Sequence, residues 1–173
     1  ITEEIPFDIP DSWRWVRLKN LSDIYTGNSI PETVKKAKYS NVVNGYAYIG
    51  TKDVNFDSSI NYDNGIKIPF EAQKFKIAHR NSTLLCIEGG SAGRKIGYLD
   101  QDVCFGNKLA TITSFIVNSK YIFYVLQSTL LFNFFKINLT GIIGGVSINK
   151  LKAFIIPLPP LKERQRIIEK YEN

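Results

Sequence analysis

The sequence predicts a mixed α/β fold of the α+β kind, in which a single globular mixed-sheet domain carries packed helices and a projecting C-terminal helix. Three observations lead to this prediction. Short apolar, β-prone runs separated by glycine-rich turns fill the middle of the chain. A later segment repeats apolar residues at spacings of three and four. Prolines then separate the body from a charged amphipathic end, and 173 residues suit one domain.

The strands are predicted from alternation or from continuous apolar runs. Residues 13–18 alternate large apolar and basic side chains, which favours a half-buried strand. Residues 82–87 are strongly apolar and predict a central strand, followed after a glycine turn by a strand at 96–99. Further strands are expected at 46–49, on either side of the turn 106–108 within 102–113, and at 153–156.

The clearest predicted helix spans residues 119–137, with Asn118 or Ser119 as its cap and apolar residues three or four apart. Shorter helical segments are expected at 19–24, near 69–75, after a cap at Ser147, and from 161 to the chain end. Residues 28–45 are interpreted as a polar surface loop, and 55–81 as a long excursion, which is typical of functional segments.

Composition bounds the kind of protein. The net charge of +6 and the pI near 9.2 are compatible with a nucleic-acid or anionic partner, although many basic proteins bind neither. No apolar run is long enough to span a bilayer, and no membrane partner is expected. Cys86 and Cys104 lie outside any CxxC motif and are predicted to be buried free thiols in a reducing compartment. Because the chain contains no Met and opens on Ile1, we expect it to be part of a longer protein.

The residue pattern argues against catalysis. His79 is the only histidine and has no Cys or acidic cluster around it in the sequence, which argues against a zinc site or a Ser-His-Asp triad. The paired prolines Pro159 and Pro160 have leucine neighbours, whereas an adenine methyltransferase would place an Asp or Asn before them and an aromatic after. We therefore predict a binding module with no cofactor, no metal and no catalytic residues.

Two basic segments have alternative interpretations. Lys35, Lys36 and Lys38 with Tyr39 form either a solvated loop or a phosphate-contacting loop with Tyr39 available for stacking. The glycine-rich segment 88–95 fails the Walker pattern. It is either a tight hairpin or an exposed loop that offers amides, Arg94 and Lys95 to a phosphate backbone.

Motifs along the whole chain resemble one family, the target recognition domain of the specificity (S) subunit of type I restriction-modification systems. The opening block is IPDSW at 9–13 with VRL at 16–18 and TG at 26–27, followed by YI at 48–49, KDV at 52–54 and GGSAGRKIG at 89–97. The most specific block is IIPLPPLKE at 155–163 leading to RII at 166–168. Arg164 stands where the family usually has Gln, with Gln165 next.

The resemblance implies a non-catalytic DNA-recognition module. Family S subunits carry two such domains, each reading one half of a split DNA target, separated by helices that form an antiparallel coiled coil and dock the modification subunits. S-adenosylmethionine, ATP and magnesium belong to the modification and restriction subunits. The implied partners are double-stranded DNA, those subunits, and a second recognition domain or second copy through the C-terminal helix. A prokaryotic cytoplasmic location follows from the family.

The resemblance and the residue chemistry together assign the chain. Residues 1–156 are expected to recognise DNA, and 157–173 to be a proline joint and the start of a spacer helix. Phosphate contacts are expected from Lys35, Lys36, Lys38, Lys52, Arg94 and Lys95. Base contacts are expected from Asn28, Ser29, Tyr39, Ser91, Asn107 and Lys108. The subunit interface is expected at Leu161, Ile168 and Tyr171.

Two alternative functions fit the same sequence. One is the recognition domain of a fused methyltransferase-endonuclease. The other is a protein-interaction module that does not bind DNA.

Overall fold

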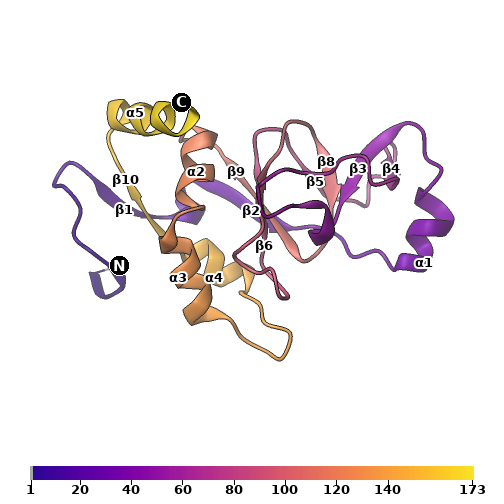
Figure 1. Cartoon of the computed structure of the whole chain (residues 1–173), viewed down its shortest axis with the longest axis horizontal. Coiled ribbons are helices and arrows are strands. Elements are labelled where there is room, and N and C mark those ends of the chain that lie inside the picture. Colours follow the sequence, from indigo (N-terminus) through magenta and orange to yellow (C-terminus); the bar gives the residue numbers. More distant parts are fainter. Residues whose placement is uncertain (1) are drawn as a thin grey trace.

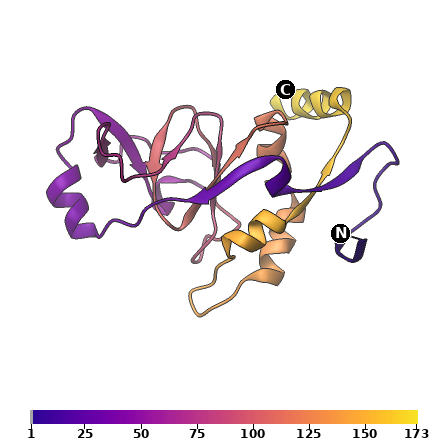
Figure 2. The same cartoon turned by 180° about the vertical axis from the view of Figure 1, so that it is seen from behind.

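The structure, a computed structural model, describes residues 2–173 and is elongated. Helices α2 to α5 gather toward one end together with a two-stranded sheet, α1 lies at the other end, and the two four-stranded sheets lie between them (Figure 1). Seen from behind, the chain runs through β1 and β2 along the length of the molecule toward α1 (Figure 2). The helical segments are η1 (Thr2–Glu4), η2 (Leu18–Asn20), α1 (Glu32–Val34), the π-helical η3 (Lys35–Tyr39), η4 (Thr51–Asp53), α2 (Ser119–Val125), α3 (Thr129–Asn138), α4 (Ile148–Ala153) and α5 (Leu161–Glu172).

An antiparallel sheet in the order β2-β9-β6-β7 forms the centre. Its strands are β2 (Ser22–Thr26), β9 (Leu109–Ser114), β6 (Thr83–Cys86) and β7 (Ile96–Tyr98). Both faces of β6 are covered: Leu85 faces the core under the helices, and Leu84 faces the core shared with the second sheet. This double burial explains why β6 reads as a continuous apolar run, and it confirms the predicted central strand.

The second sheet is mixed, in agreement with the predicted mixed-sheet fold class. Its order is β4-β3-β8-β5, from strands β4 (Lys67–Pro69), β3 (Gly45–Ile49), β8 (Val103–Phe105) and β5 (Ile77–Ala78). The pairing of β3 with β8 is parallel, and the other pairs are antiparallel. Cys86 and Cys104 are buried free thiols, as predicted, and burial raises the pKa of Cys104 to about 11.

The N-terminal strand and the proline-rich segment form a separate pair. Strand β1 (Arg14–Arg17) lies antiparallel to β10 (Ile155–Leu158), with Trp15 opposite Pro157. Pro157 therefore sits inside an edge strand, where its missing N–H is tolerated. Pro160 then precedes α5 in an extended conformation.

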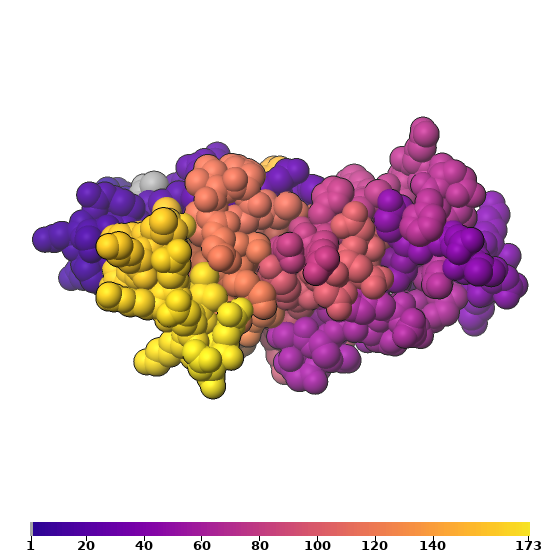
Figure 3. Space-filling view, turned by 90° about the horizontal axis from the view of Figure 1, so that it is seen from above, coloured from indigo at the N-terminus to yellow at the C-terminus, as the bar shows by residue number. Residues whose placement is uncertain are grey.

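Helix α5 lies against α2 at one end of the molecule (Figure 3). Ile168 is only 7% exposed and belongs to the core under the helices. The Tyr171 ring stacks on Tyr124 with centroids 5.0 Å apart, and Trp13 Nε1 donates to Glu163 at 2.8 Å. The C-terminal helix is thus fixed along one side while its other side faces solvent. The division at residue 156 stays a prediction.

The predicted helix 119–137 is wrong in one respect: it is broken into α2 and α3. Ser128 adopts an extended conformation with ψ 163° and starts α3, while its Oγ donates to the Val125 carbonyl at 2.6 Å. A serine that bonds to local backbone competes with the helical ladder, which explains the break.

Three other local predictions need correction. Residues 19–24 contain a 3-10 turn followed by strand β2 instead of a continuous helical turn. Residues 69–75 form successive turns, with Ala72 N donating to Pro69 O at 3.0 Å, and no helix. The segment 28–45 contains α1 and η3, so the predicted surface loop is partly helical.

Candidate nucleic-acid interface

The basic segment predicted as a loop is a short helix whose lysines differ in environment. Lys36 and Lys38 are exposed, whereas Lys35 donates to Glu32 at 3.1 Å and lies 5.4 Å from the Tyr48 ring centroid. Tyr39 is 9% exposed and packs edge-on against Phe75 in the outer core. A ring in that position is not available for stacking on a base, so we leave Tyr39 out of the interface.

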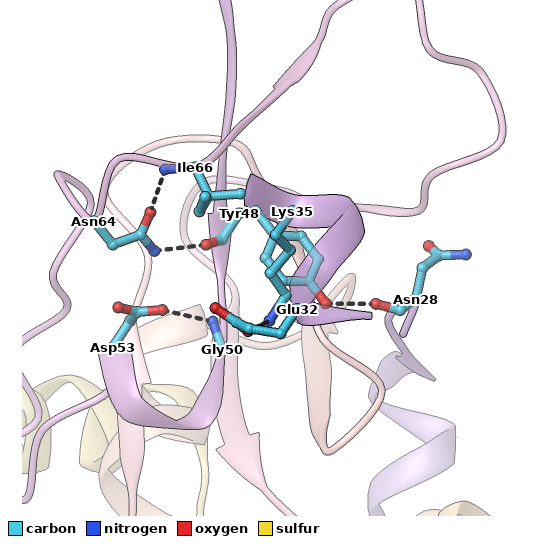
Figure 4. A network of polar contacts seen from close by, with 8 residues as sticks. All are labelled: Asn28, Glu32, Lys35, Tyr48, Gly50, Asp53, Asn64 and Ile66. Atoms are coloured by element: carbon cyan, nitrogen blue, oxygen red, sulfur yellow. Dashed lines mark hydrogen bonds and ion pairs between the residues drawn. The ribbon is translucent and has the colours of Figure 1, made fainter. Parts of the chain in front are cut away.

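The hydrogen bond from Lys35, and then its charge, lower the pKa of Glu32. The charges of Lys52 and Lys36 contribute to the same lowering, and Figure 4 shows Glu32 of α1 and Lys35 of η3 beside Gly50 and Asp53, the turn that carries Lys52. Residues 35, 36 and 52 therefore share one side of the molecule although β3 separates them in the chain.

Tyr48 anchors this side (Figure 4). Its hydroxyl donates to the Asn28 carbonyl at 2.7 Å, and its own carbonyl accepts from Asn64 Nδ2 at 2.7 Å. Burial raises the pKa of Tyr48 to about 12. The Asn28 side chain already has a hydrogen-bond partner within the domain, because its Oδ1 accepts from Lys76 N at 2.8 Å. Asn28 is thus a structural residue here, while Ser29 is exposed.

The turn that carries Lys52 is held by a carboxylate. Asp53 Oδ2 accepts from Gly50 N at 2.9 Å, and Asp53 N donates back to Gly50 O at 3.0 Å. Asp53 is 4% exposed, whereas the neighbouring Lys52 is an exposed residue. A rigid turn presents that cation at low conformational cost.

The glycine-rich segment is a hairpin between β6 and β7, which decides between its two interpretations. Its later amides are used internally: Gly93 N donates to Cys86 O at 2.8 Å, and Arg94 N donates to Ser91 O at 2.9 Å. Gly93 requires its residue type, because φ is +74° and an added Cβ would lie 2.5 Å from Phe135 Cγ. These later amides are therefore not free to contact phosphate, and the side chains of Arg94 and Lys95 are the candidates for that contact.

Arg94 and Lys95 extend from the hairpin toward residues 51–56. The guanidinium carbon of Arg94 lies 5.1 Å from the centroid of the Phe56 ring, and Lys95 Nζ lies 5.2 Å from it. Lys95 Nζ also donates to the Thr51 carbonyl at 3.1 Å, next to Lys52. Sequence reasoning missed Phe56; the available signal was a single aromatic inside a run of Asn, Asp and Ser.

The turn between β8 and β9 carries the remaining predicted DNA-contacting residues. Asn107 and Lys108 are exposed there, and the Lys108 carbonyl accepts from Ile87 N at 3.0 Å. The preceding residue, Cys86, donates its N–H to the Lys95 carbonyl at 2.9 Å. The hairpin and this turn are consequently neighbours.

We call these side chains the basic loop surface, defined as Lys35, Lys36, Lys52, Arg94, Lys95 and Lys108. It joins η3 to the η4 turn, the glycine hairpin and the β8–β9 turn through the contacts above. Lys38 and Asn107 are exposed beside its members, and Ser91 is partly buried within the hairpin. The DNA contacts of all these residues stay predictions.

Other classes of site find no support in residues 2–173. No group of three or more His, Cys, Asp or Glu side chains in that range could hold a metal ion. His79 is an exposed residue whose Nδ1 lies 3.5 Å from Asp102. None of the helices described combines the length and apolarity that a transmembrane segment needs.

The residues predicted at the subunit interface separate into two groups. Ile168 is buried within the domain, whereas Leu161 and Tyr171 are 58% and 67% exposed on α5. Beside them an apolar groove of about 710 Å³ is lined by residues including Phe7, Ile137 and Tyr171. Ile137 is 82% exposed, so this end of the molecule presents apolar surface to solvent.

The fold is shared with solved S subunits. The structure of the HsdS subunit from Thermoanaerobacter tengcongensis superposes with a TM-score of 0.72 at 23% identity, covering 98% of this chain and 38% of that one. A chain from a structure titled for complex assembly and conformational transition of the type I R-M system gives 0.72 at 22% identity, with 98% and 40% covered. The type I S subunit from M. genitalium gives 0.64 at 16% identity, with 96% and 40% covered.

This chain therefore spans about 40% of the length of these three solved chains. No curated protein matches the sequence. The family described as type I restriction modification DNA specificity domain matches residues 10–172. With that match across nearly its whole length, the chain belongs to the type I restriction-modification DNA specificity domain family.

Proposed function

We propose that this domain binds double-stranded DNA in a sequence-specific manner and reads one half of a bipartite target. Membership of the specificity-domain family supports DNA recognition within a restriction-modification system. The observation that carries the proposal for this chain is the basic loop surface, which gathers cations from η3, η4, the glycine hairpin and the β8–β9 turn. Such a surface suits a phosphate backbone.

The proposed division of labour has two levels. Lys36, Lys52, Arg94, Lys95 and Lys108 would position the duplex by contacting phosphates, independently of sequence. Loop side chains between them, Asn107 among them, would contact base edges in the major groove. Because the strands and the hairpin fix the loops, this arrangement costs little ordering on binding.

The domain itself would be non-catalytic and would direct modification and restriction subunits to the site. The apolar groove beside α5 supports a protein partner at the end opposite α1. Its exposed members, such as Phe7 at 51% and Tyr171 at 67%, are typical anchors of a protein interface. Leu161 would extend that interface along α5.

Methylation-site mapping tests the function directly. The full chain that contains this domain is produced with its modification subunits, and methylated positions are mapped in host DNA by single-molecule sequencing. We expect one bipartite site, and duplexes carrying it should bind more tightly than scrambled duplexes with a steep dependence on salt. Absence of salt-dependent binding to the mapped site would refute the DNA-binding function and favour a protein-interaction module.

A further inference from the structure

The loop between β3 and β4 holds one aromatic side chain out in solvent. Phe56 is 63% exposed. Val54 and Ile60 form a bridge that closes the loop, and Asn55 N donates to Ser59 O at 2.9 Å. Ile60 also lies under Gly97, where an added Cβ would meet its Cγ1 at 2.7 Å, so the base of the loop is packed on β7.

Polar contacts stiffen the tip of the same loop. Asp57 Oδ1 accepts from the Ser59 N at 3.0 Å and from its Oγ at 2.6 Å, and these bonds lower the pKa of Asp57. Ser58 adopts a positive φ of 71°, which closes the turn. The position of Phe56 is therefore set by the loop backbone and its polar side chains, without burial of the ring.

Two members of the basic loop surface lie on that ring. Arg94 and Lys95 approach it at 5.1 and 5.2 Å, and Lys95 is tied to Thr51 at 3.1 Å. Cation–π contacts of this kind order long basic side chains that would otherwise be mobile. The result is a rigid apolar ring flanked by cations on the surface that we propose for DNA.

The major groove offers such a ring one apolar target. Among the base edges, thymine alone carries a 5-methyl group there, and apolar side chains recognise it by contact. Phosphate-binding cations beside the ring would bring it to the groove, since backbone contacts set the register in which base contacts form.

We propose that Phe56 is a specificity-determining residue that contacts the 5-methyl group of a thymine in the target half-site. The inference rests on the proposed DNA-binding function and deepens it. Arg94 and Lys95, which lie against the ring, contact the adjacent phosphates. Phe56 supplies base discrimination, and its two cations supply sequence-independent affinity.

The test uses the full chain with its modification subunits and the target established by methylation mapping. Each thymine of the half-site is replaced in turn by uracil, which removes only the methyl group. For the wild-type protein, uracil at one position should weaken binding about 4-fold, which corresponds to the free energy of burying one methyl group. In Phe56→Ala the thymine-to-uracil ratio at that position should fall to about 1.

The control is another exposed aromatic outside the basic loop surface. Phe70 is 59% exposed and packs edge-on against Tyr46 with centroids 4.8 Å apart. Phe70→Ala should keep the wild-type ratio. Phe56→Leu, which retains an apolar side chain, should keep part of it.

Three results would overturn the inference. In the first, replacement of thymine by uracil weakens wild-type binding at no position. In the second, the loss of affinity caused by uracil persists in Phe56→Ala. In the third, Phe70→Ala abolishes that loss as fully as Phe56→Ala does. A uniform loss of affinity with an unchanged ratio would assign Phe56 to the ordering of Arg94 and Lys95 only. Failure of the proposed function is distinct, because the wild-type protein would then show no salt-dependent binding to the mapped site at all.

Discussion

Removal of charge from the basic loop surface gives the sharpest test of where DNA lies. Lys52 and Arg94 are exposed, and Lys95 joins them through Thr51. We expect a Lys52→Gln, Arg94→Gln, Lys95→Gln variant of the full chain to bind target and non-target duplexes more weakly. The loss should be of similar size for both, because phosphate contacts carry no sequence information.

The magnitude follows from counterion release. Each neutralised phosphate contributes about 0.9 to the slope of log K against log salt, so three contacts contribute about 2.7. Between about 50 and 200 mM salt, the wild-type complex should therefore lose roughly 40-fold more affinity than the variant complex. Fluorescence anisotropy with a labelled duplex, titrated at four or more salt concentrations, measures the slope.

A matched control removes the same charge elsewhere. Lys162, Arg166 and Lys170 are exposed on α5, at the opposite end from α1. Replacement of all three by Gln should change the slope of log K against log salt by no more than about 0.9, the contribution of one phosphate contact. If the control lowers the slope as much as the surface variant, net charge is responsible; if the surface variant leaves it unchanged, the DNA lies elsewhere and the reasoning is refuted.

The remaining predictions concern the support of the site and of the interface. Ile168→Ala should lower the free energy of unfolding by about 2–4 kcal/mol, because this side chain is 7% exposed, whereas Leu161→Ala, at a residue 58% exposed, should change it by less than about 0.5 kcal/mol; equal effects in a urea titration would contradict the packing of α5. Gly93→Ala should destabilise by about 2 kcal/mol or more from its positive φ and its contact with Phe135, while Gly90→Ala, with nothing within 4 Å, serves as a control expected to stay near wild type. Tyr48→Phe should cost about 1 kcal/mol at neutral pH through loss of the bond to Asn28. Because the folded pKa of Tyr48 is raised from 10.0 to about 12, its contribution is complete below pH 10 and declines as pH rises toward 12, so alkaline melting curves of the variant should fall less steeply over that window. A variant with the wild-type decline would assign it to other tyrosines, such as Tyr62.

Several elements were predictable from the sequence because local chemistry determines them. Ser147 caps α4 by accepting from Lys150 N at 3.2 Å, as expected for a serine at that position. The apolar run of β6 predicted a central strand, and of the two interpretations left open for the glycine segment after it, the structure shows the hairpin. Burial of Cys86 and Cys104 followed from their apolar neighbours.

Other local predictions were wrong because a local side-chain bond or tertiary packing outweighed the sequence pattern. Residues 119–137 keep their apolar spacing across Ser128, so the pattern alone showed one helix where the backbone breaks. The polar segment 28–45 looked like a loop since its apolar residues are sparse. Ile30 and Tyr39 nevertheless pack into the outer core, and that packing stabilises α1 and η3.

The fold class and the residue types suited to phosphate could be predicted from the sequence alone, which also shows no recognisable catalytic motif. Which of these residues share a surface depends on how the strands pair. The parallel pairing of β3 with β8 brings η4 near the β8–β9 turn, and β6 carries the glycine hairpin to the same side. The tertiary structure also buries Tyr39 and leaves Phe56 exposed. Periodicity and turn chemistry are local, whereas the proximity of loops depends on strand pairing between residues far apart in the chain, which no single segment encodes.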